Sequence, residues 1–107
     1  MLRIKKSWFR LKDTIRSVVD LIMLQSKLRG LELHVDFHEE TELPGMIYND
    51  ENRLKQVLMN LLANALKFTR QGSIRVSVRR SSAHHVELSV SDTGTSYSVT
   101  SRKVFKA

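Results

Sequence analysis

The amino-acid sequence predicts a two-layer α/β (α+β) sandwich, in which helices pack on one face of a mixed or antiparallel sheet. Two segments repeat apolar residues at helical spacing, and three others alternate apolar and polar residues as half-buried strands do. The expected order is helix, strand, short strand, helix, strand, strand, which is typical of helices gathered on one side of a sheet. A chain of 107 residues has room for one hydrophobic core.

The first half of the chain is expected to contain one helix and two strands. Apolar residues recur every three or four positions from Leu11 to Arg29, and Gly30 is the expected C-terminal stop. A strand is predicted over residues 31–37 and a short strand over residues 46–48, with an acidic turn between them.

The second half is expected to contain one helix and a hairpin. Asn49 or Asp50 can cap a helix over residues 51–68. Residues 73–79 and 86–91 alternate as two strands of an antiparallel hairpin would.

The polar loop of this hairpin is predicted at Ser81 to His84. The pattern fades after Val90, where Asp92 to Ser98 resembles a polar turn and Val99 to Ala107 remains unassigned.

Composition excludes several classes of protein. No apolar run approaches the roughly 20 residues that a bilayer span requires, and the basic start MLRIKKSWFRLKD lacks the apolar core of a secretory signal. The absence of cysteine excludes disulfides and thiolate metal sites. We therefore expect a cytoplasmic domain with no membrane span in this chain.

The net charge of +7 invites comparison with nucleic-acid-binding domains. Residues 1–29 carry eight Lys/Arg and two acids, residues 30–52 carry seven acids and no Lys/Arg, and residues 53–107 carry ten Lys/Arg and two acids. Because the basic residues are scattered through helix and strand patterns, solvated faces explain them and nucleic acid is not the expected partner. A nucleic-acid-binding alternative would use Arg75, Arg79 and Arg80.

The stretch NLLANALKFT, residues 60–69, places two asparagines four residues apart in a strongly apolar helix. The helical period gathers most apolar residues, Phe68 among them, on one face. The remaining narrow sector, here called the polar stripe, contains Arg53, Gln56, Asn60, Asn64 and Lys67. Asparagine is a mediocre helix former, so a purely structural helix does not require two of them.

Two interpretations of the polar stripe are open. In one, the side chains face water or hydrogen-bond to a neighbouring loop. In the other, they bind a ligand, because an amide oxygen suits Mg²⁺ and a lysine supplies a point charge for phosphate. Asn60, Asn64 and Lys67 would then hold a metal triphosphate.

Asp92 breaks the pattern of the last strand. Val90 points inward with the other apolar residues of that strand, and the same parity carries Asp92 inward, where an unsatisfied carboxylate is costly. Either the strand has ended and Asp92 caps a turn with Thr93 and Gly94, or its carboxylate accepts hydrogen bonds from a ligand. The exocyclic amine of adenine is such a ligand group, and Gly94 would let it approach the backbone.

The segment DENRLKQVLMNLLANALKFTRQGSIRVSV, followed by VELSVSDTG, resembles the ATP-binding catalytic domain of sensor histidine kinases. The wider superfamily includes gyrase, Hsp90 and MutL, and the resemblance covers about residues 9–94. It implies a partial Bergerat-type ATP-binding fold. Residues 1–107 are expected to form a single incomplete domain in which residues 95–107 are a degenerate tail, and the family's lid and second glycine box are expected to be missing.

The resemblance also implies roles for the residues of NLLANALKF. Asn60 and Asn64 match the asparagines that engage Mg²⁺ and the phosphates. Lys67 matches a phosphate-contacting base, and Phe68 matches the aromatic residue that lines the nucleotide site.

Asp92 and Gly94 match the aspartate that reads adenine and the first glycine of a D-x-G-x-G box. Ser96 replaces the second glycine and is expected to crowd the backbone near the nucleotide. Gln56 stands where the hydrolysing ATPases keep a glutamate base, and an amide cannot take a proton from water. The resemblance therefore implies ATP and Mg²⁺ as cofactors, without ATP hydrolysis.

The implied function is that of an ATP-binding catalytic domain in a two-component sensor histidine kinase, acting in a phosphorelay. In a full-length relative its partners are a histidine-containing dimerisation domain and a response regulator. Because the lid and second glycine box are expected to be missing, this chain alone is expected to be weak or inactive, and no catalytic residue is assigned. The alternative is a non-catalytic interaction module derived from this domain, and a weaker alternative is a basic nucleic-acid-binding domain.

Overall fold

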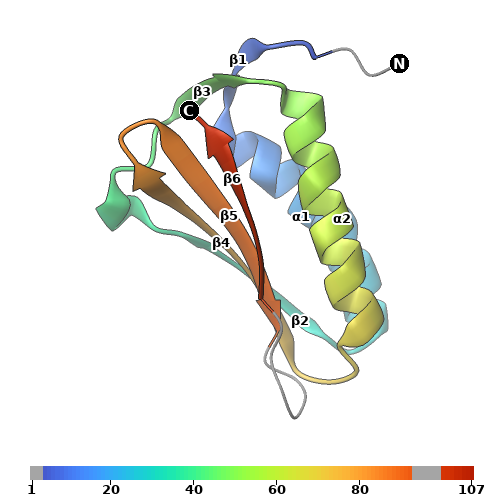
Figure 1. Ribbon diagram of the computed structural model, residues 1–107. Coiled ribbons are helices and arrows are strands. Elements are labelled where there is room, and N and C mark those ends of the chain that lie inside the picture. Colours follow the sequence, from blue (N-terminus) through green and yellow to red (C-terminus); the bar gives the residue numbers. More distant parts are fainter. Residues whose placement is uncertain (1–3, 93–99) are drawn as a thin grey trace.

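Two helices form one layer of the molecule and a four-stranded sheet forms the other, as the sequence predicts (Figure 1). The computed structural model describes residues 4–92 and 100–107. The helices are α1 (Leu11–Leu28) and α2 (Glu51–Phe68). Within the described residues, neither helix is long and apolar enough to cross a bilayer.

The main sheet is mixed, with the strand order β2-β4-β5-β6. Strand β2 (Glu32–Phe37) runs parallel to β4 (Ser73–Ser82). Strand β5 (His85–Asp92) lies antiparallel to both β4 and β6 (Thr100–Lys106). Two parallel strands need a crossover connection, and the segment between β2 and β4, which contains α2, provides it.

Three features of the strands differ from the sequence prediction. Strand β1 (Ser7–Arg10), which the sequence analysis did not predict, pairs antiparallel with β3 (Met46–Asn49) in a separate ribbon. Residues 100–106, unassigned within the expected degenerate tail, form the edge strand β6. The predicted loop from Ser81 to His84 is too long, because both serines belong to β4 and only Ala83 and His84 form the turn before β5. Short and edge strands have little buried surface, so their apolar alternation is weak.

The core lies between the helices and the inner face of the sheet. It consists of the side chains that α1, α2 and the strands turn toward one another, among them Leu11, Ile15, Val18, Ile22, Leu54, Leu58, Leu62, Leu66, Ile74, Val76, Val78, Val86, Leu88 and Val90. In α2 the buried residues are four leucines spaced by four, here called the leucine row, from Leu54 to Leu66. The prediction that Phe68 belongs to the buried face is wrong, because Phe68 lies about a quarter turn from the leucine row and is 65% exposed.

The two helices run parallel, with both N-termini at the end where the β1–β3 ribbon lies. Near their starts, Thr14 Oγ1 donates a 2.6 Å hydrogen bond to Glu51 Oε2. Near their ends, the Arg29 guanidinium donates to the carbonyl oxygens of Leu66 and Thr69. These contacts at both ends hold the helices in register above the sheet.

Helix α1 ends as predicted, at a glycine. Gly30 has a φ of +69°, a left-handed conformation that glycine adopts without a Cβ clash. The Leu31 N–H then reaches back to the Ser26 carbonyl oxygen at 2.9 Å, and the Ser26 hydroxyl donates to the Leu31 carbonyl at 2.9 Å. This turn leads directly into β2.

Asp50 caps the N-terminus of α2 and also binds the start of the chain. Its Oδ1 accepts a 3.1 Å hydrogen bond from the Arg53 N–H, and its Oδ2 accepts one of 3.1 Å from the Lys5 N–H. These two backbone donors, Arg53 first, hold the pKa of Asp50 below its ordinary value, because they stabilise the charged carboxylate.

Replacing Leu58 by alanine should lower the free energy of unfolding by about 2–5 kcal/mol, because the side chain is fully buried and its loss leaves a cavity. Leu28→Ala is the matched control, since Leu28 is 80% exposed; it should change the free energy of unfolding by less than about 0.5 kcal/mol. Urea denaturation of dilute protein measures both. Equal losses in the two variants would contradict the assignment of the leucine row to the core.

The lowered pKa of Asp50 should make the thermal stability fall in acid. The unfolded chain binds a proton more readily at this carboxyl, so its stabilising effect is complete above the unfolded pKa of about 3.9 and is lost as the pH falls through the lower folded pKa. Asp50→Asn keeps an oxygen for the cap but cannot titrate. Its melting temperature, followed by circular dichroism, should fall less than that of the wild type between about pH 5 and about pH 2. Parallel curves would show that Asp50 is not responsible.

Candidate functional site

The polar stripe of α2 faces away from the leucine row. Every member is exposed, whereas Leu54, Leu58, Leu62 and Leu66 on the opposite side are buried. The predicted alignment of Asn60, Asn64 and Lys67 along one side of the helix is therefore confirmed. Both amides and the ammonium group are accessible to a ligand.

Phe68 extends this surface at the C-terminal end of α2. The Lys67 Nζ lies 5.4 Å from the centroid of the Phe68 ring, a distance at which a cation is attracted to an aromatic face. The exposure of Phe68 removes it from the core but leaves its ring available beside the polar stripe. A planar base could stack there.

Asp92 is the last residue of β5 and points into the molecule. It lies opposite Ile74 of β4 and is only 5% exposed, so the predicted inward parity is confirmed. The alternative that the strand has already ended is not supported, because β5 includes Asp92. Its Oδ1 is buried and has no hydrogen-bond partner in the described part of the chain. A buried carboxylate oxygen without a donor is costly, and a ligand N–H would satisfy it.

Strand β5, whose last residue is Asp92, ends at the same end of the molecule as the C-terminus of α2 (Figure 1). Helix α2 ends at Phe68, the buried Thr69 follows, and a short turn leads to Ser73, the first residue of β4. The Thr69 hydroxyl is also buried without a partner among the described residues. Lys67, Phe68 and Asp92 are therefore brought to one end of the sandwich, and Asn60 lies about two helical turns away. Gly94, and Ser96 after it, lie outside the described residues.

A pocket of about 350 Å³ lies against the N-terminal half of α2. Its lining residues are Ile4, Lys5, Asp50, Asn52, Arg53, Gln56, Val57 and Asn60. Asn60 is the one predicted ligand-binding residue in this lining, and Asp92 does not belong to it. The contribution of Ile4 and Lys5 was not predicted from sequence, because the hydrogen bond from the Lys5 N–H to Asp50 that positions them joins residues 45 positions apart.

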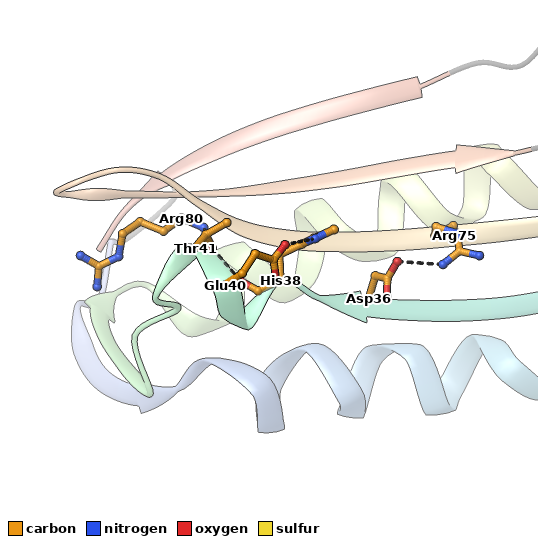
Figure 2. A network of polar contacts seen from close by, with 6 residues as sticks. All are labelled: Asp36, His38, Glu40, Thr41, Arg75 and Arg80. Carbon is orange, nitrogen blue, oxygen red and sulfur yellow. Dashed lines mark hydrogen bonds and ion pairs between the residues drawn. The ribbon is translucent and has the colours of Figure 1, made fainter.

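The arginines of β4 do not form one basic surface. Arg75 Nη1 is 2.8 Å from Asp36 Oδ2 across the strand pair (Figure 2). Arg79 lies opposite Glu87 of β5. Arg80 has the other parity, and its N–H donates to Thr41 Oγ1 at 2.9 Å. Two of the three arginines are thus neighbours of carboxylates, and the third points to the other face of the sheet. The nucleic-acid-binding alternative gains no support from this arrangement.

The chemistry of the candidate site rests on amides and one carboxylate. Across residues 4–92 and 100–107, no three or more His, Cys, Asp or Glu side chains are grouped closely enough to hold a metal ion. A divalent cation at the polar stripe would therefore depend on the asparagine oxygens and on oxygens of a bound ligand.

Comparison with known proteins agrees with this geometry. Residues 49–106, more than half of the chain, match the family described as histidine kinase-, DNA gyrase B-, and HSP90-like ATPase. The autoinducer 2 sensor kinase/phosphatase LuxQ of Vibrio cholerae is 40% identical over 77 residues, which are 72% of this chain and 9% of LuxQ. The chain thus spans about a tenth of the length of the curated relatives it matches.

Solved structures show the same relationship. Full-length ShkA in complex with AMPPNP superposes with a TM-score of 0.77 and 29% identity, over 87% of this chain and 19% of ShkA. The histidine kinase ThkA in complex with the response regulator TrrA superposes with a TM-score of 0.73 and 26% identity, over 86% of this chain and 27% of ThkA. The sequence resemblance to sensor histidine kinases is therefore confirmed, and the chain belongs to the histidine kinase-, DNA gyrase B- and HSP90-like ATPase family.

Proposed function

We propose that this chain binds ATP as part of the catalytic domain of a two-component sensor histidine kinase. The observation that carries the proposal is the buried Oδ1 of Asp92, which has no partner among the described residues. Asp92 ends β5 at the same end of the sandwich where α2, the helix that exposes Asn60, Asn64 and Lys67, also ends. In a member of this ATPase family, such a carboxylate is suited to accept a hydrogen bond from the exocyclic amine of adenine.

The adenine end of the site would be formed by Asp92, Phe68 and Gly94. The Asp92 carboxylate accepts hydrogen bonds only, so it would distinguish an amino-purine from a purine that bears a carbonyl oxygen at the same position. The exposed Phe68 ring would cover one face of the base. Gly94, which lacks a side chain, would let the ligand approach the backbone after β5.

The phosphate end would lie along the polar stripe. The amide oxygens of Asn60 and Asn64 would hold Mg²⁺ together with phosphate oxygens, and the Lys67 ammonium would offset the phosphate charge. The helical rise places Asn60 and Lys67 about 10 Å apart along the axis of α2, on the same side of the helix. Bound Mg²⁺ would neutralise charge on the phosphates during transfer of the terminal one.

Gln56 favours transfer of phosphate to another protein over hydrolysis as the reaction of the whole kinase. Its side chain is exposed on the polar stripe, one turn before Asn60, where a carboxylate could act as a base toward water. An amide has no such basicity.

The partners of this proposed function are a histidine-containing dimerisation domain and a response regulator, both in the context of the whole protein. The complex of ThkA with TrrA supports this assignment, because ThkA resembles this chain in sequence and in fold. A cytoplasmic location is part of the same proposal, since the ligand and the phosphorelay partners belong to that compartment.

A non-catalytic interaction module is the second candidate. It is favoured by one observation, the exposure of three leucines on α1, which the nucleotide site does not use. The two functions are compatible, because α1 contributes no residue to the polar stripe.

Titration with a fluorescent ATP analogue in the presence of Mg²⁺ tests the proposed site. The wild type should show saturable binding, and Asn64→Ala and Asp92→Ala should each weaken it by at least about tenfold, because each removes a hydrogen bond to a charged or metal-bound group. Gln25→Ala is the matched control, since Gln25 is an exposed amide residue of α1, which contributes no residue to the polar stripe. Binding that all three variants weaken equally, or that none weakens, would contradict the assignment.

Incubation with radiolabelled ATP and Mg²⁺ tests the inference from Gln56. We expect no release of inorganic phosphate above the level of the Asn64→Ala variant, because the site lacks a base that could activate water. Phosphate release by the wild type that disappears in Asn64→Ala would show that this site hydrolyses ATP.

A further inference from the structure

Helix α1 presents a line of leucines to solvent. Leu21, Leu24 and Leu28 are 66%, 65% and 80% exposed, and their spacing of three and four residues aligns them along one side of the helix. The opposite side of α1 packs on the core through Ile15, Val18 and Ile22. No other described element covers the three leucines, so they form an unpartnered apolar seam of the kind that pairs with a second helix.

Charges of opposite sign flank this seam on one side. Asp20 precedes Leu21 and Lys27 precedes Leu28, so that the two charges are seven residues apart and share one flank of the helix. Within the described residues, neither side chain forms an ion pair. The acid lies toward the N-terminal end of the seam and the base toward its C-terminal end.

This pattern is complementary to itself. If a second α1 lies antiparallel across a two-fold axis at Leu24, each Leu21 lies within one residue, about 1.5 Å along the helix axis, of the partner's Leu28. The same operation places Asp20 within one residue of the partner's Lys27, and Lys27 within one residue of the partner's Asp20, which long side chains can span. The same patch on each copy thus contacts its equivalent on the other copy, and each charge pair occurs twice. Such self-complementarity is required of a two-fold symmetric interface. The antiparallel arrangement also sets the positive end of each helix dipole beside the negative end of the other.

We propose that the leucine seam of α1 is a docking surface for a second copy of this chain, in an antiparallel α1–α1 pair centred on Leu24. The contact is small, because three leucines per copy expose much less than the roughly 800 Å² per partner of a standard interface. The pair is therefore weak and concentration-dependent, with a dissociation constant on the order of 100 μM. It uses no residue of the polar stripe and stands independently of nucleotide binding.

The absence of cysteine from the natural chain makes a cross-linking test direct. In Leu24→Cys the two thiols meet at the two-fold axis, so mild oxidation should give a disulfide-linked dimer on a non-reducing gel. Ser81→Cys is the matched control, because Ser81 is exposed near the end of β4, away from α1. We expect Leu24→Cys to form dimer at least about tenfold faster than Ser81→Cys at equal concentration.

Charge reversal tests the pairing of Asp20 with Lys27. In the Leu24→Cys background, Asp20→Lys should slow dimer formation by roughly tenfold, because two attractions become repulsions, and adding Lys27→Asp should restore the rate.

Sedimentation velocity of the chain without cysteine should show a matching concentration-dependent dimer. Circular dichroism confirms that each exposed substitution leaves the fold intact. The proposal is overturned if Leu24→Cys cross-links no faster than Ser81→Cys, if the double reversal fails to restore the rate, or if the wild type stays monomeric well above the expected dissociation constant.

Discussion

Burial of the leucine row of α2 against the inner face of the sheet is the contact on which the candidate site depends. Leu54, Leu58 and Leu62 are fully buried, and the sheet below them is lined by apolar residues of β4 and β5. A helix whose one side is fixed in this way has its opposite side fixed as well, because successive residues are set about 100° apart. The asparagines and the lysine are therefore directed outward by the same apolar burial that stabilises the domain.

The sheet imposes a second constraint at the end of β5. Alternation along the strand turns Val86, Leu88 and Val90 into the core, and it carries Asp92 with them. A hydrophobic residue at this position would be buried without the free-energy cost of desolvating a carboxylate. The carboxylate instead leaves one oxygen buried and unpartnered within the described residues. Such a cost is accepted in proteins where a ligand supplies the missing donor, and this is why Asp92 is the most informative residue of the site.

The solvent-facing sides of the two helices differ in chemical character. Helix α2 is amphipathic in the usual sense, with polar residues on its outer side. Helix α1 buries one side but places leucines on the other, so burial within the domain does not account for its whole apolar content. The two charges beside these leucines, Asp20 and Lys27, have opposite signs at the two ends of the seam. An antiparallel second α1 would bring each of them near the opposite charge of its partner. Binding of a nucleotide and contact with another copy would thus occupy different helices.

Local periodicity allowed much of this protein to be predicted from sequence alone. Sequence predicted the span of α2, its stop-and-cap residues at Gly30 for α1 and at Asn49 or Asp50 for α2, the alignment of Asn60 with Asn64 and the inward parity of Asp92, because each depends on residues within a few positions of one another. The structure chose Asp50 over Asn49 as the cap. Pairing over long distances was decided only by the tertiary structure. The joining of β1 to β3, the parallel course of β2 and β4, and the placement of Ile4 and Lys5 beside Asn60 all link distant residues. The exposure of Phe68 was also decided there, since the sheet selected which row of apolar residues on α2 it would cover. The spacing of apolar residues along α2 predicts that one side of the helix is apolar. Which of these residues are buried depends on the strands that pack against the helix.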